Sequence, residues 1–565
     1  MDNNQAEKIS YIKNLKPLTV IIVIGILLYL PVLFFNFTYL DDNNLIIGNQ
    51  YFLSNLSNFF KSFTIDVFHL FNSSAFYYRP VLTISLMLDY QIGGISPFIY
   101  HFTNVILHIS ASYLLFIFLS KLNYKKELSF LFSLIFLVHP VLTQAVAWVP
   151  GRNDSLLAVF VLLTFIFYIK YIEEQRIKNL LLSILFLAVS LFTKESGVLV
   201  IPIILFYLYF IYKKNNKDNK LSINKFYFFF SSVGVASLWI ILRHFALRGS
   251  PSINLINMIK SILINSPAIL QFAGKIFFPF NLSVLPVIQD TTFVYGIFSI
   301  VILTFLLIFT NVKRWNYILF GVGWFFAFLL PSFIRPNSNL VADFIEHRLY
   351  VPIIGIFIIL LETDIIKSIN FKKKAHLIVL IALIIGLSLI TLIHSNTFKN
   401  RLNFWKDAAM HSPHYPLAHR NLGAMEYLDG DTIDAEKEYK IALKLNPNEP
   451  MAHNNLGLIY ANNGDIKAAE DEYKNEIQVN PYYDDVYFNL GLLYFGQKRN
   501  DEAVENWKKT LDLNPNHLGA LKVLTNYYYN NKKYEEALGY ANILYRMGFE
   551  LPPDLLKMIE LGTVN

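Results

Sequence analysis

The sequence predicts an all-α protein made of a polytopic membrane helix bundle and a C-terminal solenoid of helix pairs. Of its 565 residues, 54% are hydrophobic and only 16% are charged, which is too apolar for an ordinary soluble domain. Apolar runs long enough to cross a bilayer recur through the first two thirds of the chain. The last third is polar and repeats with a period of about thirty-four residues.

The first apolar run covers residues 18–37 and follows Lys8, Lys13 and Lys16. It lacks a small-residue cleavage site, so we expect a retained anchor rather than a removed signal peptide. Further runs bring the total to about eleven spans. They cover residues 97–119, 128–149, 156–172, 180–192, 198–212, 226–245, 293–310, 317–333, 349–361 and 376–394.

Residues 253–286 are apolar but are interrupted by Pro267, Pro279 and Pro286. Such a segment is compatible with an interfacial helix, a re-entrant pair or another crossing. We favour the interfacial arrangement because it keeps every later lysine cluster on one side of the membrane.

Positive charge collects in every second connection between the spans. The clusters are Lys121/Lys125/Lys126, Lys170/Arg176/Lys178, Lys213/Lys214/Lys217/Lys220/Lys225, Lys313/Arg314 and Lys367/Lys372/Lys373/Lys374. Cytoplasmic loops are rich in Lys and Arg, so this pattern predicts a cytoplasmic N-terminus and, after an odd number of spans, an extracytoplasmic tail. It also explains the net charge of +7 without nucleic-acid binding, which we do not expect. The Lys- and Asn-rich composition without Cys points to a bacterial inner membrane and excludes disulfides and thiolate sites.

The polar tail carries the tetratricopeptide (TPR) period. Asn-Leu-Gly recurs at 421–423, 455–457 and 489–491, and Pro447, Pro481 and Pro515 recur at the same interval. The predicted boundaries are a membrane domain at 1–395, a connector at 396–415, about four repeats at 416–551 and a cap at 552–565.

Recurring residues in the tail predict packing and a binding groove. Helix interlocking is expected at Leu422, Leu456, Leu490 and Leu524, at Ala435, Ala469, Ala503 and Ala537, and at Tyr439, Tyr473 and Trp507. The concave groove is expected to bind an acceptor protein or peptide through Asn421, Asn455, Asn489 and Asn526. The alternative is that these asparagines only support packing and turns.

An acidic pair, Asp41 and Asp42, follows the first span. A carboxylate held beside apolar residues at the membrane boundary gains proton affinity, which suits a general base that deprotonates a hydroxyl. The alternative is a solvated surface loop.

Sparse cations occupy the connections on the same side as Asp41. They are Arg79, Arg152, Lys194 and Arg348, accompanied by Asp154, Glu195 and His347. Arginine forks and lysine point charges bind phosphate oxygens, so these residues are candidates for holding an anionic substrate. The alternatives are a local Arg152–Asp154 ion pair and a helix-capping hairpin at Lys194–Glu195.

Polar residues also occur within the apolar runs. His101, Asn104 and His108 share one helical face, and His139 precedes a proline. They are candidates for substrate binding, with hydrogen bonding between helices as the alternative. The two histidines of the face lie two turns apart, so we expect no metal site.

These motifs, in this order and with a TPR tail, resemble the transmembrane-and-TPR protein O-mannosyltransferases. Those enzymes belong to the polyprenyl-phosphate-sugar glycosyltransferases with the multi-spanning GT-C fold. The resemblance places the family's acidic motif on Asp41 and Asp42 and its Gly-Arg-x-Asp element on Arg152 and Asp154. It implies inverting transfer of mannose from a polyprenyl-phosphate carrier to Ser or Thr hydroxyls of proteins outside the cytoplasm. It implies neither a metal nor a cofactor beyond the lipid-linked donor.

Two other functions compete with this expectation. A GT-C enzyme acting on a lipid or a polysaccharide fits the membrane part equally well, and the TPR tail disfavours it only slightly. A non-catalytic membrane-anchored TPR scaffold is disfavoured because an anchor needs one span and no outward acids and arginines. Transport is disfavoured because the spans lack acids near their centres.

Overall fold

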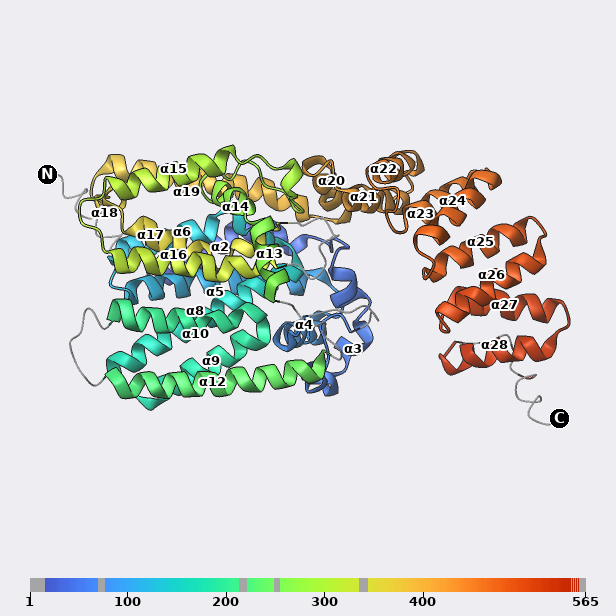
Figure 1. Ribbon diagram of the computed structural model, residues 1–565, viewed down its shortest axis with the longest axis horizontal. Helices are drawn as coiled ribbons and strands as arrows, with labels where there is room; N and C mark the ends of the chain where they lie inside the picture. The colour runs from blue at the N-terminus through green and yellow to red at the C-terminus, as the bar shows by residue number, and fades with distance from the viewer. Residues whose placement is uncertain are drawn as a thin grey trace. The chain divides into compact units, whose positions relative to one another are not determined.

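A computed structural model describes residues 16–69, 77–212, 221–247, 255–334 and 344–549, together with 551, 553, 555 and 557. Helices account for nearly all regular structure in these residues, and none of them forms a β-strand. The chain divides into two compact units, residues 1–412 and 413–565. The all-α prediction is confirmed in both units (Figure 1).

The first unit contains seven helices, among the described residues, that are long and apolar enough to cross a membrane. Two further bent pairs raise this number to nine, and two shorter apolar helices accompany them. The seven contain α2 (Pro17–Tyr29), α5 (Pro97–Lys121), α8 (Arg152–Glu174), α10 (Val200–Phe206), α12 (Leu221–Ala246), α16 (Trp315–Leu329) and α19 (Lys374–Ser395). Adjoining helical turns lengthen five of them, so that α10, for example, lies within a span over Glu195–Tyr212. The chain is therefore a multi-pass integral membrane protein.

Every predicted span overlaps one of the helices of this unit. Those not yet named are α6 (Lys126–Val138), α9 (Ile177–Thr193), α15 (Val294–Ile308) and α17 (Ile353–Leu361). The total of about eleven crossings stays a prediction, because α9, α15 and α17 are shorter than a full span.

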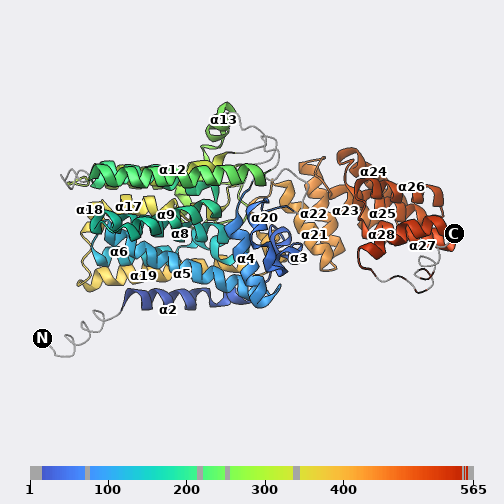
Figure 2. The same cartoon turned by 90° about the horizontal axis from the view of Figure 1, so that it is seen from below.

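Connections between successive helices gather at two opposite ends of the bundle. At one end, Lys121 pairs with Glu173 and Tyr124 donates to Glu362 at 2.7 Å. Arg314 pairs with the same Glu362 at 2.6 Å. Figures 1 and 2 show α18 (Asp364–Lys367) at this end and α3 (Gln50–Ser54) and α4 (Pro80–Gly93) at the other.

Two residues of the predicted cytoplasmic clusters, Arg314 and Lys367, pair with Glu362 at this end. The cluster Lys213/Lys214/Lys217/Lys220 lies outside the described residues, and no side chain is described for Lys225. The predicted alternation of the connections therefore agrees with the helix packing, while the assignment of this end to the cytoplasm stays a prediction.

The proline-interrupted segment forms α13 (Leu255–Asn265) and α14 (Ala268–Phe277), bent by 49° at their junction. Ser261 and Asn265 of α13 both donate to the Phe333 carbonyl. Lys275 of α14 pairs with Glu346 at 2.7 Å. Both helices thus contact the end of the bundle opposite Glu362, which favours an interfacial or re-entrant segment over a full crossing.

The predicted connector is largely part of the first unit rather than a linker. After α19 the chain forms η12 (Asn396–Phe398) and α20 (Arg401–His411), and the unit ends at Ser412. Phe404 and Trp405 of α20 are fully buried. The predicted cap at 552–565 lies mostly outside the described residues.

The second unit consists of four helix pairs, as the period predicts. They are α21 (Pro416–Leu428) with α22 (Thr432–Leu445), α23 (Ala452–Asn462) with α24 (Ile466–Val479), α25 (Asp484–Gly496) with α26 (Asn500–Leu513), and α27 (Leu518–Asn530) with α28 (Tyr534–Arg546). All the recurring Leu, Ala and aromatic positions named above are buried. A Cβ on Gly491 would lie 2.5 Å from Trp507, so glycine is needed where the paired helices approach most closely.

Candidate active site

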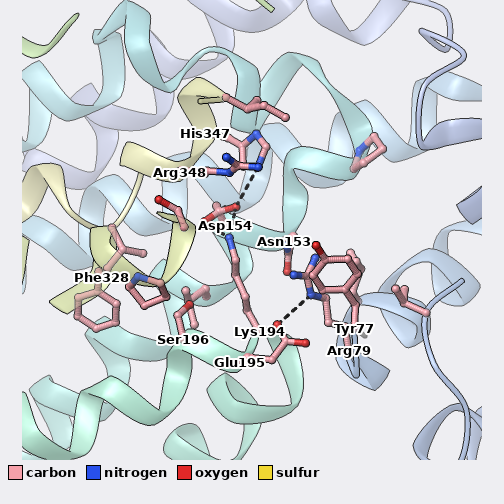
Figure 3. Close-up of a pocket in the computed structure, with 18 of the residues that line it drawn as sticks. Tyr77, Arg79, Asn153, Asp154, Lys194, Glu195, Ser196, Phe328, His347 and Arg348 are labelled. Carbon is pink, nitrogen blue, oxygen red and sulfur yellow. Dashed lines mark hydrogen bonds and ion pairs between the residues drawn. The ribbon is translucent and has the colours of Figure 1, made fainter. Parts of the chain in front are cut away.

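A cavity of about 650 Å³ opens among the connections at the end of the bundle opposite Glu362. Many of its polar residues come from five segments that are distant in sequence. They are Asp41 after α2, Arg79 before α4, Asn153 and Asp154 at the start of α8, Lys194 and Glu195 after α9, and His347 and Arg348 of η11 (Glu346–Leu349). Figure 3 shows most of these side chains directed toward one another.

Asp154 lies at the centre of the polar wall and is 3% exposed. Both of its oxygens accept from Lys194 Nζ at 2.8 Å, and His347 Nε2 lies 3.7 Å from Oδ2. Burial lowers the pKa of Lys194, and Asp154 offsets this only in part. Asp154 therefore holds Lys194 in the cavity wall, with the His347 ring beside it (Figure 3).

Arg79 is held by a second acid. Its Nε pairs with Glu195 at 3.3 Å, and its guanidinium stacks 4.4 Å from the Tyr77 ring. Asn153, oriented with its oxygen toward Arg79, accepts from Nη1 at 2.9 Å. Burial, the largest effect, lowers the pKa of Arg79, but Glu195, Tyr77 and Asp154 together outweigh burial and raise this pKa. The guanidinium is thus charged and fixed in one orientation.

The acidic pair is divided by the fold. Asp41 is partly exposed and lines the cavity, whereas Asp42 is fully buried and does not line it. Thr38 donates to Asp42 Oδ2 through its backbone N–H at 2.9 Å and through its hydroxyl. Burial raises the pKa of Asp42, and these hydrogen bonds offset the rise only in part. Of the two candidate bases, only Asp41 is placed to contact a substrate in the cavity.

His347 contributes a neutral imidazole. Burial lowers the pKa of His347 well below 6.5, and the charges of Lys194, Arg348 and Arg79 lower it further. Its ring lies 5.5 Å from the Trp148 ring, and its backbone N–H donates to Gln144 Oε1 at 3.2 Å. A neutral histidine in this wall can donate or accept a hydrogen bond without adding charge.

The cavity combines positive charge with an apolar wall. Among the described lining residues, four cations, Arg79, Lys194, Arg243 and Arg348, accompany three carboxylates, Asp41, Asp154 and Glu195. Apolar lining residues include Met258, Phe328, Pro331, Val351 and Pro352. The excess positive charge beside an apolar surface suits an amphiphilic anion.

Arg152 is placed differently from expectation. Its guanidinium is fully buried and pairs with Asp89 at 2.5 Å, not with Asp154. It also donates to Asn104 Oδ1 and to the Tyr100 carbonyl, each at 2.7 Å. Arg152 therefore forms neither the alternative ion pair with Asp154 nor part of the cavity lining expected of a substrate-binding residue, because α8 presents Arg152 to α4 and α5 and Asp154 to the cavity.

The polar face of α5 also stays away from the cavity. Asn104 donates to the carbonyls of Val146 and Trp148. His108 bonds Tyr350 and the Leu137 carbonyl. His101 is likewise buried and does not line the cavity.

His139 is buried, and its Nε2 forms a hydrogen bond with the Ile276 carbonyl at 2.9 Å. Asn104, His108 and His139 follow the alternative of hydrogen bonding between segments. The His101 ring packs against the Phe35 ring.

In the repeats, the asparagine positions differ between units. Asn421, Asn455 and Asn489 are all half-buried, and Asn489 donates to Asn454 Oδ1 of the preceding repeat at 2.9 Å. Asn526 is exposed but lies three residues beyond the corresponding position, which Val523 occupies. The predicted row of four equivalent asparagines is therefore a row of three.

Some cavity residues were not selected from the sequence. Asn153, Trp148 and Arg243 line the cavity, and Asp89 neutralises Arg152. Asp89 carried a signal that went unused, since an acid within an apolar helix needs a buried partner. Nothing in the sequence distinguished Arg243 at the end of α12 as a cavity residue, because arginines near helix ends are common at membrane boundaries. No group of three or more His, Asp or Glu among the described residues is arranged to hold a metal ion.

Comparison with known proteins gives a match for each of the two units. The family model "Dolichyl-phosphate-mannose-protein mannosyltransferase" matches residues 80–239. This range begins one residue after Arg79 and includes Asp154 and Lys194. Tetratricopeptide repeat models match residues 429–482 and 485–517.

Curated relatives share the same description. Protein O-mannosyl-transferase TMTC2 of Homo sapiens is 32% identical over 236 residues, which are 38% of this chain and 28% of that protein. Protein O-mannosyl-transferase F38B6.6 of Caenorhabditis elegans is 26% identical over 458 residues, or 77% of this chain and 63% of that protein. The chain thus spans less than two thirds of the length of either relative.

Among solved structures, PilF of Pseudomonas aeruginosa is 25% identical with a TM-score of 0.27, covering 32% of this chain and 82% of that one. MamA is 24% identical with a TM-score of 0.24, and the match covers 26% of this chain and 85% of MamA. The motifs, the family models and the relatives agree that this chain is similar, in its membrane unit and in its repeats, to the transmembrane-and-TPR protein O-mannosyltransferases.

Proposed function

We propose that this protein transfers mannose from a polyprenyl-phosphate carrier to Ser or Thr hydroxyls of proteins outside the cytoplasm. The observation that carries the proposal is that Asp41 lines the same cavity as Arg79, Lys194 and Arg348. A carboxylate that accepts a proton and cations that hold a phosphate are the parts that this transfer needs. The similarity to protein O-mannosyl-transferases supports mannose as the sugar and protein as the acceptor.

In the proposed reaction, Asp41 accepts the proton of the acceptor hydroxyl as the hydroxyl oxygen attacks the anomeric carbon. The bond between that carbon and the phosphate oxygen breaks, and the lipid phosphate leaves with the bonding electron pair. A single displacement inverts the anomeric configuration, and the proposal needs no metal and no cofactor beyond the donor. The cavity cations stabilise the charge that develops on the departing phosphate.

The apolar wall gives the donor's lipid a place beside the phosphate. Phe328 lies in the last turn of α16, Pro331 follows that helix, and Val351 and Pro352 precede α17. Both helices continue from the cavity along the bundle, so an isoprenoid chain entering from the bilayer would contact them before its phosphate reaches the cations. This arrangement supports a lipid-linked donor over a soluble nucleotide sugar.

The site is proposed to face the extracytoplasmic side of a bacterial inner membrane. The cavity lies at the end of the bundle opposite the basic connections around Glu362. Basic connections mark the cytoplasmic side, so the cavity and the acceptor proteins share the outer side. The TPR groove, with Asn421, Asn455 and Asn489, is proposed to bind the acceptor chain.

The test compares full-length variants in kinetic assays with a polyprenyl-phosphate mannose and an acceptor peptide. Asp41→Asn keeps the shape of the side chain but cannot accept the proton, so kcat should fall by about 10²- to 10⁴-fold with little change in the KM for the donor. Glu127→Gln, an exposed acid at the other end of the bundle, should be unaffected.

Intact-mass analysis of outer-face proteins from cells with and without the chain identifies acceptor and sugar together. A hexose on proteins that disappears with Asp41→Asn supports the proposal. Unchanged protein masses with a hexose-bearing lipid or polysaccharide would instead assign a different acceptor, and wild-type turnover by Asp41→Asn would reject the enzyme.

A further inference from the structure

Helix α20 contacts both walls of the cavity, although it lies next to the repeats in sequence. Its neighbours in space include the loop that carries Asp41 and the segment that supports His347. We propose that α20 is a positioning element of the active site, with Trp405 orienting the Asp41 loop and Asp407 orienting His347. This inference rests on the proposed function of the cavity and adds residues that contact no substrate.

The first contact fastens the acidic loop. Trp405 is 1% exposed, and its Nε1–H donates to the Thr38 carbonyl at 3.2 Å. Thr38 in turn donates to the buried Asp42 through two groups. Asp41 lies between Thr38 and Asp42 in a turn that these bonds close, so the position of its carboxylate depends on where Trp405 holds Thr38.

Residues 399–401, at the start of α20, make two more contacts with the loop that carries Asp41. The Asn36 N–H donates to the Lys399 carbonyl at 2.9 Å, and the Arg401 guanidinium lies 5.3 Å from the Tyr39 ring. Tyr39 has a φ of 61°, a left-handed conformation that is costly for a residue with a Cβ. A strained residue persists only where its surroundings hold it, and Arg401 of α20 is one of the groups that contact Tyr39.

The second contact reaches His347 through a chain of hydrogen bonds. Asp407 is 7% exposed, and its Oδ2 accepts from the Val284 N–H at 3.1 Å. The Val284 carbonyl accepts from Gln144 Nε2 at 2.9 Å, and Gln144 Oε1 accepts from the His347 N–H at 3.2 Å. The first two links are buried and the third is partly buried, so water has little access to these groups along most of the path.

A buried charge cluster reinforces this second wall. Glu346, the residue before His347, bonds Lys275 at 2.7 Å and His394 of α19 at 2.9 Å. Its Oε1 also accepts from the Ser283 N–H, next to Val284. The segment before α20 and α20 itself therefore hold η11 from two directions.

The two contacts serve different steps of the proposed reaction, so breaking them should change different kinetic parameters. Loss of the Trp405 contact misplaces the base, which affects the attack and therefore kcat. Loss of the Asp407 contact displaces His347 and its neighbour Arg348, which affects donor binding and therefore the KM for the donor. A helix that only stabilised the fold would lower the fraction of active protein, and kcat normalised to folded protein and KM would then both stay unchanged.

The experiment uses full-length variants that remove single hydrogen bonds. Trp405→Phe deletes the indole N–H but keeps an aromatic ring, and we expect kcat to fall about three- to thirtyfold at an unchanged donor KM. Gln144→Met removes both amide groups at nearly the same size, and we expect the donor KM to rise by about the same factor with kcat largely kept. Asp407→Ala breaks the same chain of hydrogen bonds at its other end. It replaces Gln144→Met as the test if Gln144→Met folds poorly, and it should likewise raise the donor KM.

Matched controls separate positioning from stability. Lys406→Ala changes an exposed residue of the same helix and should leave kcat, KM and Tm unchanged. Thr38→Val removes the hydroxyl donor to Asp42 and should lower kcat, whereas Thr38→Ser should restore it. Trp405→Phe combined with Thr38→Val should lower kcat by less than the product of the single effects, because both act through the same loop.

The outcomes distinguish failure of this inference from failure of the proposed function. If Asp41→Asn abolishes transfer but kcat normalised to folded protein and the donor KM are unchanged in Trp405→Phe, Gln144→Met and Asp407→Ala, α20 is only structural. If Asp41→Asn retains transfer, the proposed function itself is rejected. A kcat effect at Trp405 and a KM effect at Gln144 or Asp407, with a silent Lys406→Ala, establish α20 as part of the site.

Discussion

At the scale of single residues, neighbours in sequence have separate roles. Asp41 lines the cavity and Asp42 is buried, and Asp154 lines the cavity while Arg152, two positions earlier, is buried against Asp89. The pattern of charges identified these residues as exceptional in an apolar chain, but it could not assign each to the cavity or to the interior. That assignment depends on the direction of each side chain from its helix or turn.

The Arg152–Asp89 pair provides the first prediction at this scale. Asp89→Asn leaves a buried guanidinium without its counter-charge, which should destabilise the protein by about 3–5 kcal/mol and lower the recovery of folded protein. Lys194→Met, in the cavity wall, should instead raise the donor KM while the Tm changes less. Thermal unfolding in detergent together with donor kinetics separates the two, and equal loss of Tm in both variants would contradict the different roles.

A second prediction concerns pH and His347. The folded protein keeps this histidine neutral because its pKa lies well below 6.5, whereas the unfolded chain takes up a proton near 6.5. The unfolded state therefore binds more protons as the pH falls below 6.5, so the contribution of His347 to stability is present above that pH and is lost progressively below it.

His347→Gln removes this proton uptake and should flatten the pH dependence of Tm between about pH 5 and 7.5 relative to the wild type. The measurement is the difference between the two Tm profiles, because other histidines contribute equally to both. Parallel profiles would show that His347 titrates normally in the folded protein.

At the scale of elements, the cavity depends on how closely two helices pack. Gly321 of α16 and Gly355 of α17 face each other, and a Cβ on Gly355 would lie 2.3 Å from the Gly321 carbonyl oxygen. Small residues of this kind allow membrane helices to approach closely. The ends of these two helices carry Phe328, Val351 and Pro352 into the cavity wall.

Gly355→Ala should therefore push α16 and α17 apart and cost about 1–3 kcal/mol of stability, with a lower Tm. Gly323→Ala lies on the same helix as Gly321 but meets no atom within 4 Å, so it should be neutral. Thermal unfolding of both variants under identical detergent conditions measures the difference. Equal Tm values would show that the helices can separate at no cost.

At the scale of the whole molecule, the fold gives the membrane unit two chemically different ends. Basic connections surround Glu362 at one end, and the cavity with its acids and cations occupies the other. Polar chemistry at both ends of an apolar bundle is the arrangement expected of a protein that spans a bilayer.

The absence of Cys allows this orientation to be tested with single cysteines. Ser57→Cys near the cavity end and Glu505→Cys in the repeats should react with a membrane-impermeant maleimide in intact spheroplasts. Lys125→Cys, exposed at the basic end, should react only after permeabilisation. Labelling of Lys125→Cys in intact cells, or protection of Glu505→Cys, would contradict the proposed topology.

The sequence by itself determined the class of the protein, its helices and its repeats, because hydrophobic periodicity and a fixed repeat length are patterns among residues that are close together in the chain. It also selected Asp41, Arg79, Asp154, Lys194, Glu195, His347 and Arg348, since charges in an apolar chain are rare enough to be conspicuous.

Only the tertiary structure decided which of the selected residues share the cavity, that Arg152 belongs to Asp89, and that the supposed connector is the helix that carries Trp405 and Asp407. The physical reason is that a buried ion pair and a cavity contact both appear in sequence as a polar residue in an apolar setting. Which one forms depends on partners that are far away in the chain and that only packing brings together.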